Sequence, residues 1–237
     1  MYKYQLSIVI PFYNEEDNVR DVVENLEKEV KNNKINYELI LVNNGSDDST
    51  PQIIKDLKKR NPTIKQVNIQ KNQGYGWGII NGLNIARGEY IGYVDGDNQI
   101  HPKFIIDAYN KLKETNAILC ITRRLNRKAG FIRKIASIGY NTIVNILFLT
   151  KVKDVNSKPK FIKHKFYKEL KLSSKDWFID TEIVLKAKNN GFKFIEIPVR
   201  YNERKKGKSK VRISILKELL FDIIKYKLTS TKSQFEN

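Results

Sequence analysis

Short apolar runs alternate along this chain with segments whose apolar residues recur at helical spacing, and this alternation constrains the fold most. Residues 6–12 form an apolar run interrupted only by Ser7, and Val19, Val22, Val23 and Leu26 follow it at helical spacing. The alternation continues to about residue 124. Strands that alternate with helices predict βαβ units joined by right-handed crossovers. We therefore predict an α/β fold with a mostly parallel central sheet flanked by helices.

The same patterns set approximate limits for each element and each region. Predicted strands span residues 6–12, 37–44, 64–70, 89–97, 117–124 and 192–202. Predicted helices span residues 14–32, 52–60, 76–88, 102–115, 131–150, 176–191 and 213–228. We predict one domain over residues 1–210, followed by a C-terminal amphipathic helix and polar tail over residues 211–237.

Composition narrows the classes of partner and the kinds of site. A chain of 237 residues can bury a substantial core, and its net charge of +18 points to a polyanionic partner. Nucleic acid, an anionic membrane surface and phosphorylated substrates all fit that charge. Cys120 is the only cysteine and the two histidines lie far apart, which excludes an intrachain disulfide and argues against zinc. We expect no membrane span and no signal peptide, and hence a cytoplasmic protein.

Carboxylates follow the predicted strand 89–97 in the sequence YVDGDNQ. In an extended segment Asp95, Asp97 and Gln99 point to the same side and present oxygen ligands to one hard cation. Mg²⁺ or Mn²⁺ suits such ligands, with phosphate oxygens and water completing the shell. The alternative is a polar turn that ends the strand.

Polar loops also follow the first two predicted strands, and carboxyl ends of parallel strands share the ligand-binding edge. In PFYNEE the ring of Tyr13 can stack on a nucleobase and Glu15 can accept from a base or ribose; alternatively Asn14 caps a helix. In NNGSDDST the amide of Asn44 can pair with a base edge. The alternative there is a loop in which Asp48 or Ser49 caps the next helix.

Basic and acidic residues in the second half of the chain have two interpretations each. In residues 203–212, Arg204 and Lys210 can stabilise a departing diphosphate, or the segment is a solvated charge run. Asp180 and Glu182 can act as a base toward a hydroxyl acceptor, or they are helix-surface or capping acids. The helices 131–150 and 213–228 have apolar faces edged by Lys and Arg, which suit a membrane interface or packing on the sheet.

The motifs VIPFYNE, VNNGSDDST, NQGYGWGIINGLNIARGEYIGYVDGD and RKKGKSK occur in an order that resembles family 2 glycosyltransferases with the GT-A fold. The resemblance covers roughly residues 5–210 and is greatest to the dolichyl- and polyprenyl-phosphate sugar synthases. It implies a nucleotide-sugar donor and a lipid phosphate acceptor. Residues that match the donor-binding and metal-binding positions of the family are Pro11, Tyr13, Glu15, Asn44, Asp95, Asp97 and, as a third metal ligand, Gln99.

The resemblance also implies positions that act on the phosphates. Arg123 matches an arginine after the next strand, and Arg133 and Ser137 match a pair near the acceptor phosphate. The positions that match a loop closing over the donor are Arg204, Gly207, Ser209 and Lys210. Two departures bear on specificity. Asn43 and Asn44 stand where relatives usually have Asp, and Lys158-Pro159 stands where many relatives have Gly-Phe.

The function implied is metal-dependent, inverting transfer of a sugar from GDP-mannose or a UDP-hexose to dolichyl or undecaprenyl phosphate. Mg²⁺ or Mn²⁺ is the implied cofactor, and the implied location is peripheral, at the cytoplasmic face of a membrane. Alternatives are a soluble glycan hydroxyl acceptor, an inactive relative that only binds, and a basic nucleic-acid-binding protein. The sequence has no helix-turn-helix, zinc-finger or aromatic RNA-binding signature, which argues against nucleic acid. A membrane-anchoring protein partner and a homo-oligomer remain open.

Overall fold

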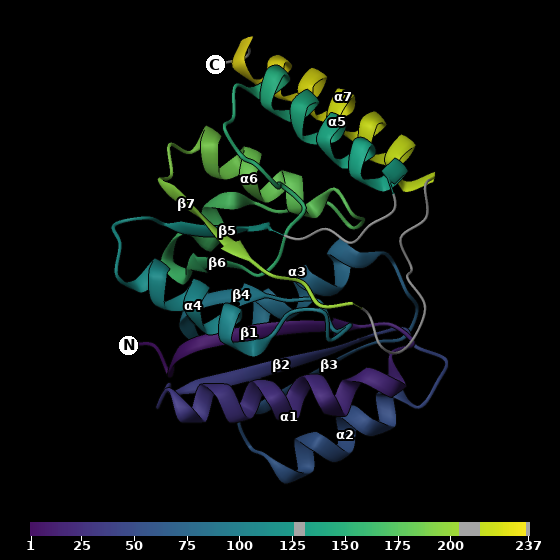
Figure 1. The fold of residues 1–237 in the computed structure, drawn as a ribbon, viewed down its shortest axis with the longest axis vertical. Coiled ribbons are helices and arrows are strands. Elements are labelled where there is room, and N and C mark those ends of the chain that lie inside the picture. The colour runs from purple at the N-terminus through teal and green to yellow at the C-terminus, as the bar shows by residue number, and fades with distance from the viewer. Residues whose placement is uncertain (126–130, 204–213, 236–237) are drawn as a thin grey trace.

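The computed structural model describes residues 1–125, 131–203 and 214–235. Side chains at 131–133, 214–217 and 229–235 lie outside the description. Within these ranges the chain forms one sheet with helices on both faces (Figure 1). The predicted α/β fold is therefore confirmed.

The sheet of the described ranges has seven strands in the order β3-β2-β1-β4-β6-β5-β7. The strands are β1 (Tyr4–Phe12), β2 (Tyr37–Asn44), β3 (Ile64–Ile69), β4 (Gly88–Tyr93), β5 (Leu119–Arg124), β6 (Lys160–Lys163) and β7 (Phe194–Val199). All pairs are parallel except those of β6, which runs antiparallel to both β4 and β5. Periodicity did not predict β6, because this four-residue strand has a lysine at each end and lacks an apolar run.

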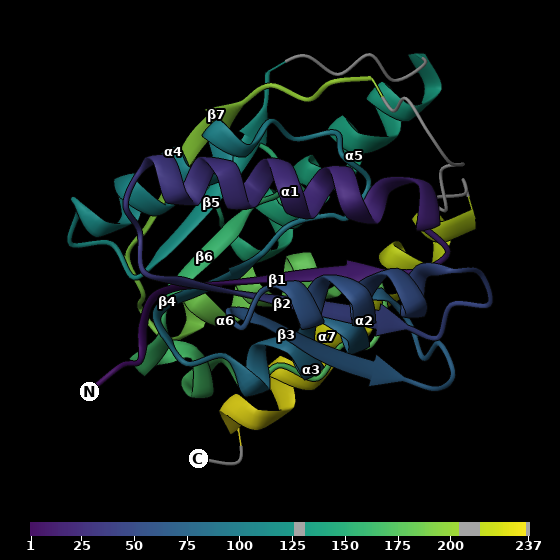
Figure 2. The same cartoon turned by 90° about the horizontal axis from the view of Figure 1, so that it is seen from below.

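Helices cover both faces of the sheet (Figures 1 and 2). They are α1 (Glu16–Asn32), α2 (Thr50–Arg60), α3 (Tyr75–Ile85), α4 (Pro102–Lys113), α5 (Phe131–Phe148), α6 (Ile179–Asn189), α7 (Ser214–Phe235) and the 3₁₀ helix η1 (His164–Leu170). Helices α1, α2 and α4 share a core with one face, and α3 and α6 share a core with the other. Helices α5 and α7 pack side by side at one end of the molecule (Figure 1).

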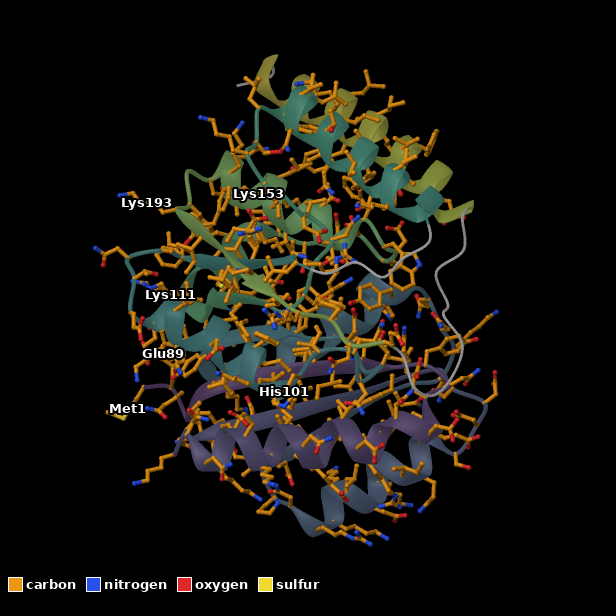
Figure 3. The ribbon with its side chains drawn as sticks, in the orientation of Figure 1. Met1, Glu89, His101, Lys111, Lys153 and Lys193 are labelled. Carbon is orange, nitrogen blue, oxygen red and sulfur yellow. The ribbon has the colours of Figure 1, made fainter. Side chains whose placement is uncertain are left out.

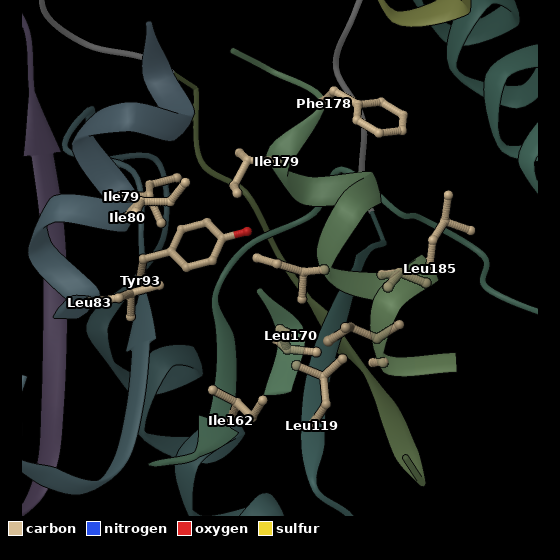
Figure 4. Packing of buried hydrophobic residues seen from close by; sticks show 14 of the residues in the cluster. Ile79, Ile80, Leu83, Tyr93, Leu119, Ile162, Leu170, Phe178, Ile179 and Leu185 are labelled. Atoms are coloured by element: carbon tan, nitrogen blue, oxygen red, sulfur yellow. The ribbon is translucent and has the colours of Figure 1, made fainter. Parts of the chain in front are cut away.

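The central strands β1 and β2 are apolar along most of their length because both of their faces are buried. Ile8 and Leu39 point into the core under α1 and α2, whereas their neighbours Val9 and Ile40 point into the core under α3 and α6. The core under α3 and α6 includes Tyr93, whose hydroxyl is directed toward α6 (Figure 4). This polar atom inside an apolar core requires a partner, which α6 supplies.

The parallel neighbours β2, β1 and β4 bring the carboxyl ends of three strands to one edge of the sheet. This confirms that the loops after residues 12, 44 and 93 lie together, as the parallel arrangement predicted. Met1, Glu89 and Lys111 lie at the opposite edge (Figure 3).

Two local predictions at this edge are wrong. The segment after β4 is not extended, because it bends at 96–98 and Asn98 has a left-handed φ of 59°. Asn14 does not cap α1, because its φ is 50° and its side chain accepts from Asp47 N–H across the loop, while Glu15 occupies the cap position. Both turns break the periodicity on which the sequence-based prediction depended.

Helices α5 and α7 leave part of their surface uncovered. Leu219 and Ile223 of α7 are buried in the core, so the C-terminal helix packs on the rest of the chain. Ile146 of α5 and Phe221 of α7 are 68% and 67% exposed. Across the described ranges, no helix is both long enough and apolar enough to traverse a bilayer. The predicted boundary near residue 210 falls outside the described residues and stays a prediction.

Candidate functional site

Reciprocal hydrogen bonds join the loops that follow β1 and β2. Asn14 N–H donates to Ser46 Oγ at 3.0 Å, and Glu15 N–H donates to Thr50 Oγ1 at 3.0 Å. The Glu15 carboxylate accepts from Asn18 Nδ2 at 2.6 Å and is 8% exposed. Tyr13 is half-buried beside it, directly after the end of β1. The donor-binding residues predicted in these two loops therefore lie at one edge, on a backbone that cross-loop bonds hold in place.

The side chain of Asn44 is buried at the end of β2. Its Nδ2 donates to Gly74 C=O at 3.0 Å, while its Oδ1 is buried and accepts from no described residue. A carboxylate could not donate to Gly74, so this contact requires an amide side chain at position 44. The amide therefore keeps an acceptor oxygen beside α3 that a ligand N–H could use.

Asp95 is held from one side by an aromatic pair. Tyr75 O–H donates to Asp95 Oδ1 at 2.5 Å, and the ring of Tyr75 stacks on Trp177 with centroids 4.4 Å apart. Gly76 N–H and Trp77 N–H donate to the backbone carbonyls of residues 176 and 175, so these amides at the start of α3 already have partners. One oxygen of Asp95 is thus fixed, and its side chain is 22% exposed.

Asp97 and Gln99 lie on the bend that follows Asp95. Asp97 Oδ1 accepts from Gln99 N–H at 3.2 Å, and Gln99 Nε2 donates to Asn202 C=O at 3.1 Å. Ile100 also forms a backbone bridge with Tyr201. The segment after β7 is therefore attached next to Asp97. The predicted loop residues Arg204, Gly207, Ser209 and Lys210 follow it and lie outside the described residues.

A buried charge cluster lies behind Asp95. Asp180 Oδ2 is 2.9 Å from Lys158 Nζ, and Asp180 Oδ1 is 2.5 Å from Lys160 Nζ. Tyr93 O–H donates to the same Oδ1 at 2.6 Å. Lys158 Nζ is also 3.7 Å from Asp95 Oδ2. Lys158, Lys160 and Asp180 are 6%, 1% and 1% exposed, so water screens their charges little.

Mutual attraction sets the ionisation of this cluster. Burial opposes ionisation of Asp180, but Lys158 and Lys160 outweigh it and lower the pKa of Asp180 below its usual value. Burial likewise opposes the charged form of Lys158, yet Asp180 and Asp95 raise the pKa of Lys158. For Lys160 burial dominates and lowers its pKa. Asp180 is therefore a stable anion and a weak base.

Glu182 points away from this cluster and has a full set of partners. Its carboxylate accepts from Ser173 N–H, Ser173 Oγ and Ser174 N–H at 2.9–3.1 Å, and Lys186 Nζ lies 2.6 Å away. Burial by itself would raise the pKa of the Glu182 carboxyl group, but these contacts outweigh burial, and the pKa is lower than its usual value. Glu182 thus anchors the segment before α6. The alternative that Asp180 and Glu182 are helix-surface or capping acids is wrong, because both are 1% exposed and no described side chain caps α6.

The arginine and serine candidates are less closely connected to Asp95. Arg123 is the penultimate residue of β5 and acts electrostatically on Glu196. Its neighbour Arg124 forms a bidentate pair with Asp154 at 2.6 Å. Ser137 C=O on α5 accepts from Asn141 Nδ2 at 2.7 Å. The side chain of Arg133 lies outside the described residues. The described structure brings Asp95, Asp97, Gln99 and Asp180 into one region and leaves Glu182 outside it.

The donor atoms at Asp95 fit a hard divalent cation bound together with a phosphate ligand. Carboxylate oxygens of Asp95 and Asp97 are ligands that Mg²⁺ and Mn²⁺ prefer, and such sites commonly share the ion with phosphates. Within the described part of the chain, no three His, Cys, Asp or Glu side chains gather closely enough to hold a metal. A cation here would therefore take part of its shell from the substrate or from water.

Sequence reasoning missed the aromatic and lysine residues around Asp95. Tyr75, Tyr93 and Trp177 resemble ordinary core residues in the sequence, and no motif marks Lys160. Lys158 alone gave a signal, as a departure from the pattern of related chains. The lysines became visible as site residues only when β6 placed them beside α6.

Comparisons with known proteins agree with this geometry. A dolichyl-phosphate beta-glucosyltransferase of Trichomonas vaginalis is 30% identical over 234 residues, covering 93% of this chain and 72% of that protein. A dodecaprenyl-phosphate galacturonate synthase of Rhizobium johnstonii is 30% identical over 225 residues, covering 93% and 65%. The chain spans 40% to 72% of the length of these and other curated relatives.

Solved structures with the same fold include glucosyl-3-phosphoglycerate synthase from Mycobacterium tuberculosis, in complex with Mn²⁺, UDP and glucosyl-3-phosphoglycerate. It superposes with a TM-score of 0.71 at 16% identity, covering 96% of this chain and 80% of that one. The model of glycosyl transferase family 2 matches residues 7–171. The matched region contains most of β1, all of β2 and β4, and the polar loops after them. The chain therefore belongs to glycosyl transferase family 2.

Proposed function

We propose that this glycosyltransferase moves a sugar, with inversion, from a nucleotide-sugar donor to a polyprenyl phosphate at the cytoplasmic face of a membrane. GDP-mannose and UDP-hexoses are the candidate donors, and dolichyl and undecaprenyl phosphates are the candidate acceptors. The names of two relatives, which specify dolichyl phosphate and dodecaprenyl phosphate, support this acceptor class.

One observation carries the choice of acceptor. Asp180 is buried between two lysines, and Glu182 is bound by one lysine and two backbone amides. These partners lower the pKa of both carboxyl groups, so neither is suited to removing a proton from a hydroxyl group. A phosphate monoester is already ionised near neutral pH and needs positioning rather than a base. The site therefore favours a phosphate acceptor over a sugar hydroxyl.

Donor binding follows from the residues at the carboxyl edge of the sheet. Tyr13 and Glu15 would contact the nucleoside, and the free acceptor oxygen of Asn44 would receive a base N–H. Asp95 and Asp97 would hold Mg²⁺ or Mn²⁺ on the diphosphate, with Gln99 as a further ligand. The bound cation would stabilise the negative charge that develops on the departing nucleotide. A structural neighbour contains Mn²⁺ and UDP, which supports this assignment.

The exposed apolar surface of α5 and α7 supports the membrane location. Exposed side chains on these helices and the turn after α5 include Ile135, Ile138, Ile146, Leu149, Leu220, Phe221, Ile224 and Leu228. Lys225 and Lys227 are exposed on α7 beside them. Apolar side chains next to lysines suit a helix pair that lies in an anionic membrane interface, and the net charge of +18 adds attraction.

A transfer assay tests the reaction. Purified protein receives labelled GDP- and UDP-sugars in turn, with polyprenyl phosphate and Mg²⁺ or Mn²⁺. We expect label in the organic phase with one donor, lost with EDTA or with Asp97→Ala. The matched variant Asp107→Ala, which removes an exposed carboxylate on α4, should retain transfer. Undiminished transfer by Asp97→Ala would refute the metal role. Transfer only to soluble glycans would move the assignment to a hydroxyl acceptor, and salt-sensitive nucleic-acid binding without nucleotide-sugar binding would refute it entirely.

A further inference from the structure

We propose that Lys158 is a built-in counter-ion of Asp95 that competes with the divalent cation, so that the cation binds well only together with the anionic diphosphate. This inference rests on the proposed metal-binding role of Asp95. It concerns a buried lysine whose charge lies next to a ligand oxygen of the proposed metal site.

The two oxygens of Asp95 have different surroundings. Oδ1 accepts the hydrogen bond from Tyr75, and Oδ2 lies 3.7 Å from Lys158 Nζ. Oδ2 is therefore the oxygen with more capacity to bind a cation, and it is the one that faces the lysine. A cation placed on Oδ2 would lie close to a like charge.

Lys158 is held where it is by several groups. Its Nζ lies 2.9 Å from Asp180 Oδ2, 5.0 Å from the ring centre of Tyr75 and 6.0 Å from that of Trp177. Its backbone N–H donates to Tyr201 Oη at 3.0 Å. Because the side chain is only 8% exposed, the ammonium group cannot move freely into water when a cation arrives.

The charges of the cluster make the competition strong. Lys158 and Lys160 balance Asp95 and Asp180, so this group of side chains is close to neutral before any ligand binds. A divalent cation alone would leave it strongly positive, and Asp97 offsets only part of that charge. A cation that arrives with a nucleoside diphosphate brings its own negative charge. The lysine therefore disfavours the bare ion and favours the complex of ion and nucleotide.

Mn²⁺ binding without nucleotide tests the proposal, with the free ion counted by its electron paramagnetic resonance signal. In Lys158→Met we expect the dissociation constant for Mn²⁺ to fall by about tenfold or more, because a like charge near the ligand oxygen is gone. Lys111→Met makes the same change in net charge at the opposite edge of the sheet (Figure 3) and should leave the constant unchanged. Adding UDP should tighten Mn²⁺ binding more in the wild type than in Lys158→Met.

Other variants separate the possible failures. Lys158→Gln serves if Lys158→Met does not fold, and the same tightening is expected because Gln is neutral. General damage to the site would weaken Mn²⁺ binding, so it cannot produce the tightening that we expect. If either folded variant binds Mn²⁺ no more tightly than the wild type, the proposal is overturned. Asp95→Asn should weaken Mn²⁺ binding in every background. If neither Asp95→Asn nor Asp97→Ala weakens it, the metal site of the proposed function fails and this inference fails with it.

Discussion

Replacing Asp180 by Asn should lower the free energy of unfolding strongly, although the change only turns a carboxylate into a neutral amide of the same shape. Asp180 is 1% exposed and is the shared anion of Lys158 and Lys160, at 2.9 and 2.5 Å. At an effective dielectric constant of about 20, each attraction has a gross value of about 6 kcal/mol, most of which the desolvation of the ions offsets. Removing the anion leaves buried cations uncompensated, and the expected loss in free energy of unfolding is about 3–5 kcal/mol.

Urea denaturation and thermal melting measure this loss. For a domain of this size the melting temperature should fall by roughly 10 °C. Asp107→Asn, an exposed carboxylate on α4, should change the free energy of unfolding by less than about 0.5 kcal/mol. Combining Asp180→Asn with Lys160→Met removes one uncompensated cation and should recover part of the loss.

The wild-type pH dependence provides a second measurement. The lowered pKa of Asp180 means that its contribution to stability is present above the unfolded value near 3.8 and is lost as pH falls through the lower folded value. Asp180→Asn should flatten this acid limb. If the free energy of unfolding of Asp180→Asn lies within about 1 kcal/mol of the wild-type value, the claim that these buried charges neutralise one another is refuted.

Three further predictions concern α3, α6 and the exposed helix pair. Gly76→Ala should lose about 1–3 kcal/mol of stability, because its Cβ would collide with backbone carbonyls before α6. Gly139→Ala, whose Cβ would meet nothing within 4 Å, should gain about 0.5–1 kcal/mol. Urea titrations measure the free energy of unfolding of both variants. Glu182→Gln should reduce the loss of stability below pH 4.5, because a carboxyl group with a lowered pKa stabilises only while ionised; melting temperatures from pH 3 to 6 measure this, and an unchanged acid limb would contradict it. Phe221→Asp should reduce flotation with anionic vesicles several-fold, whereas Ile85→Asp, 42% exposed on α3, should not; equal flotation would argue against membrane contact through α7.

The sequence by itself determined the class of fold and the edge at which the site lies. Apolar runs such as residues 6–12 are long because both faces of the strands are buried. Such a run can be recognised in the sequence before the neighbouring strands and helices are known. Since neighbouring parallel strands end at one edge, Asp95, Asn44 and Tyr13 could be placed together from their positions after strands. The motifs in these loops also sufficed to indicate the family.

Only the tertiary structure decided which charges meet. Lys158 and Lys160 lie in a segment with no apolar run, and their burial depends on insertion of β6 between β4 and β5. In the sequence Asp180 resembles a surface acid, but in the structure its position on α6 brings it into contact with these lysines and with Tyr93. Local periodicity indicates which face of an element is apolar. The desolvation of a buried charge is offset by charged partners that lie far away in the sequence, and periodicity does not identify them. The counter-ions of the site therefore had to be found in three dimensions.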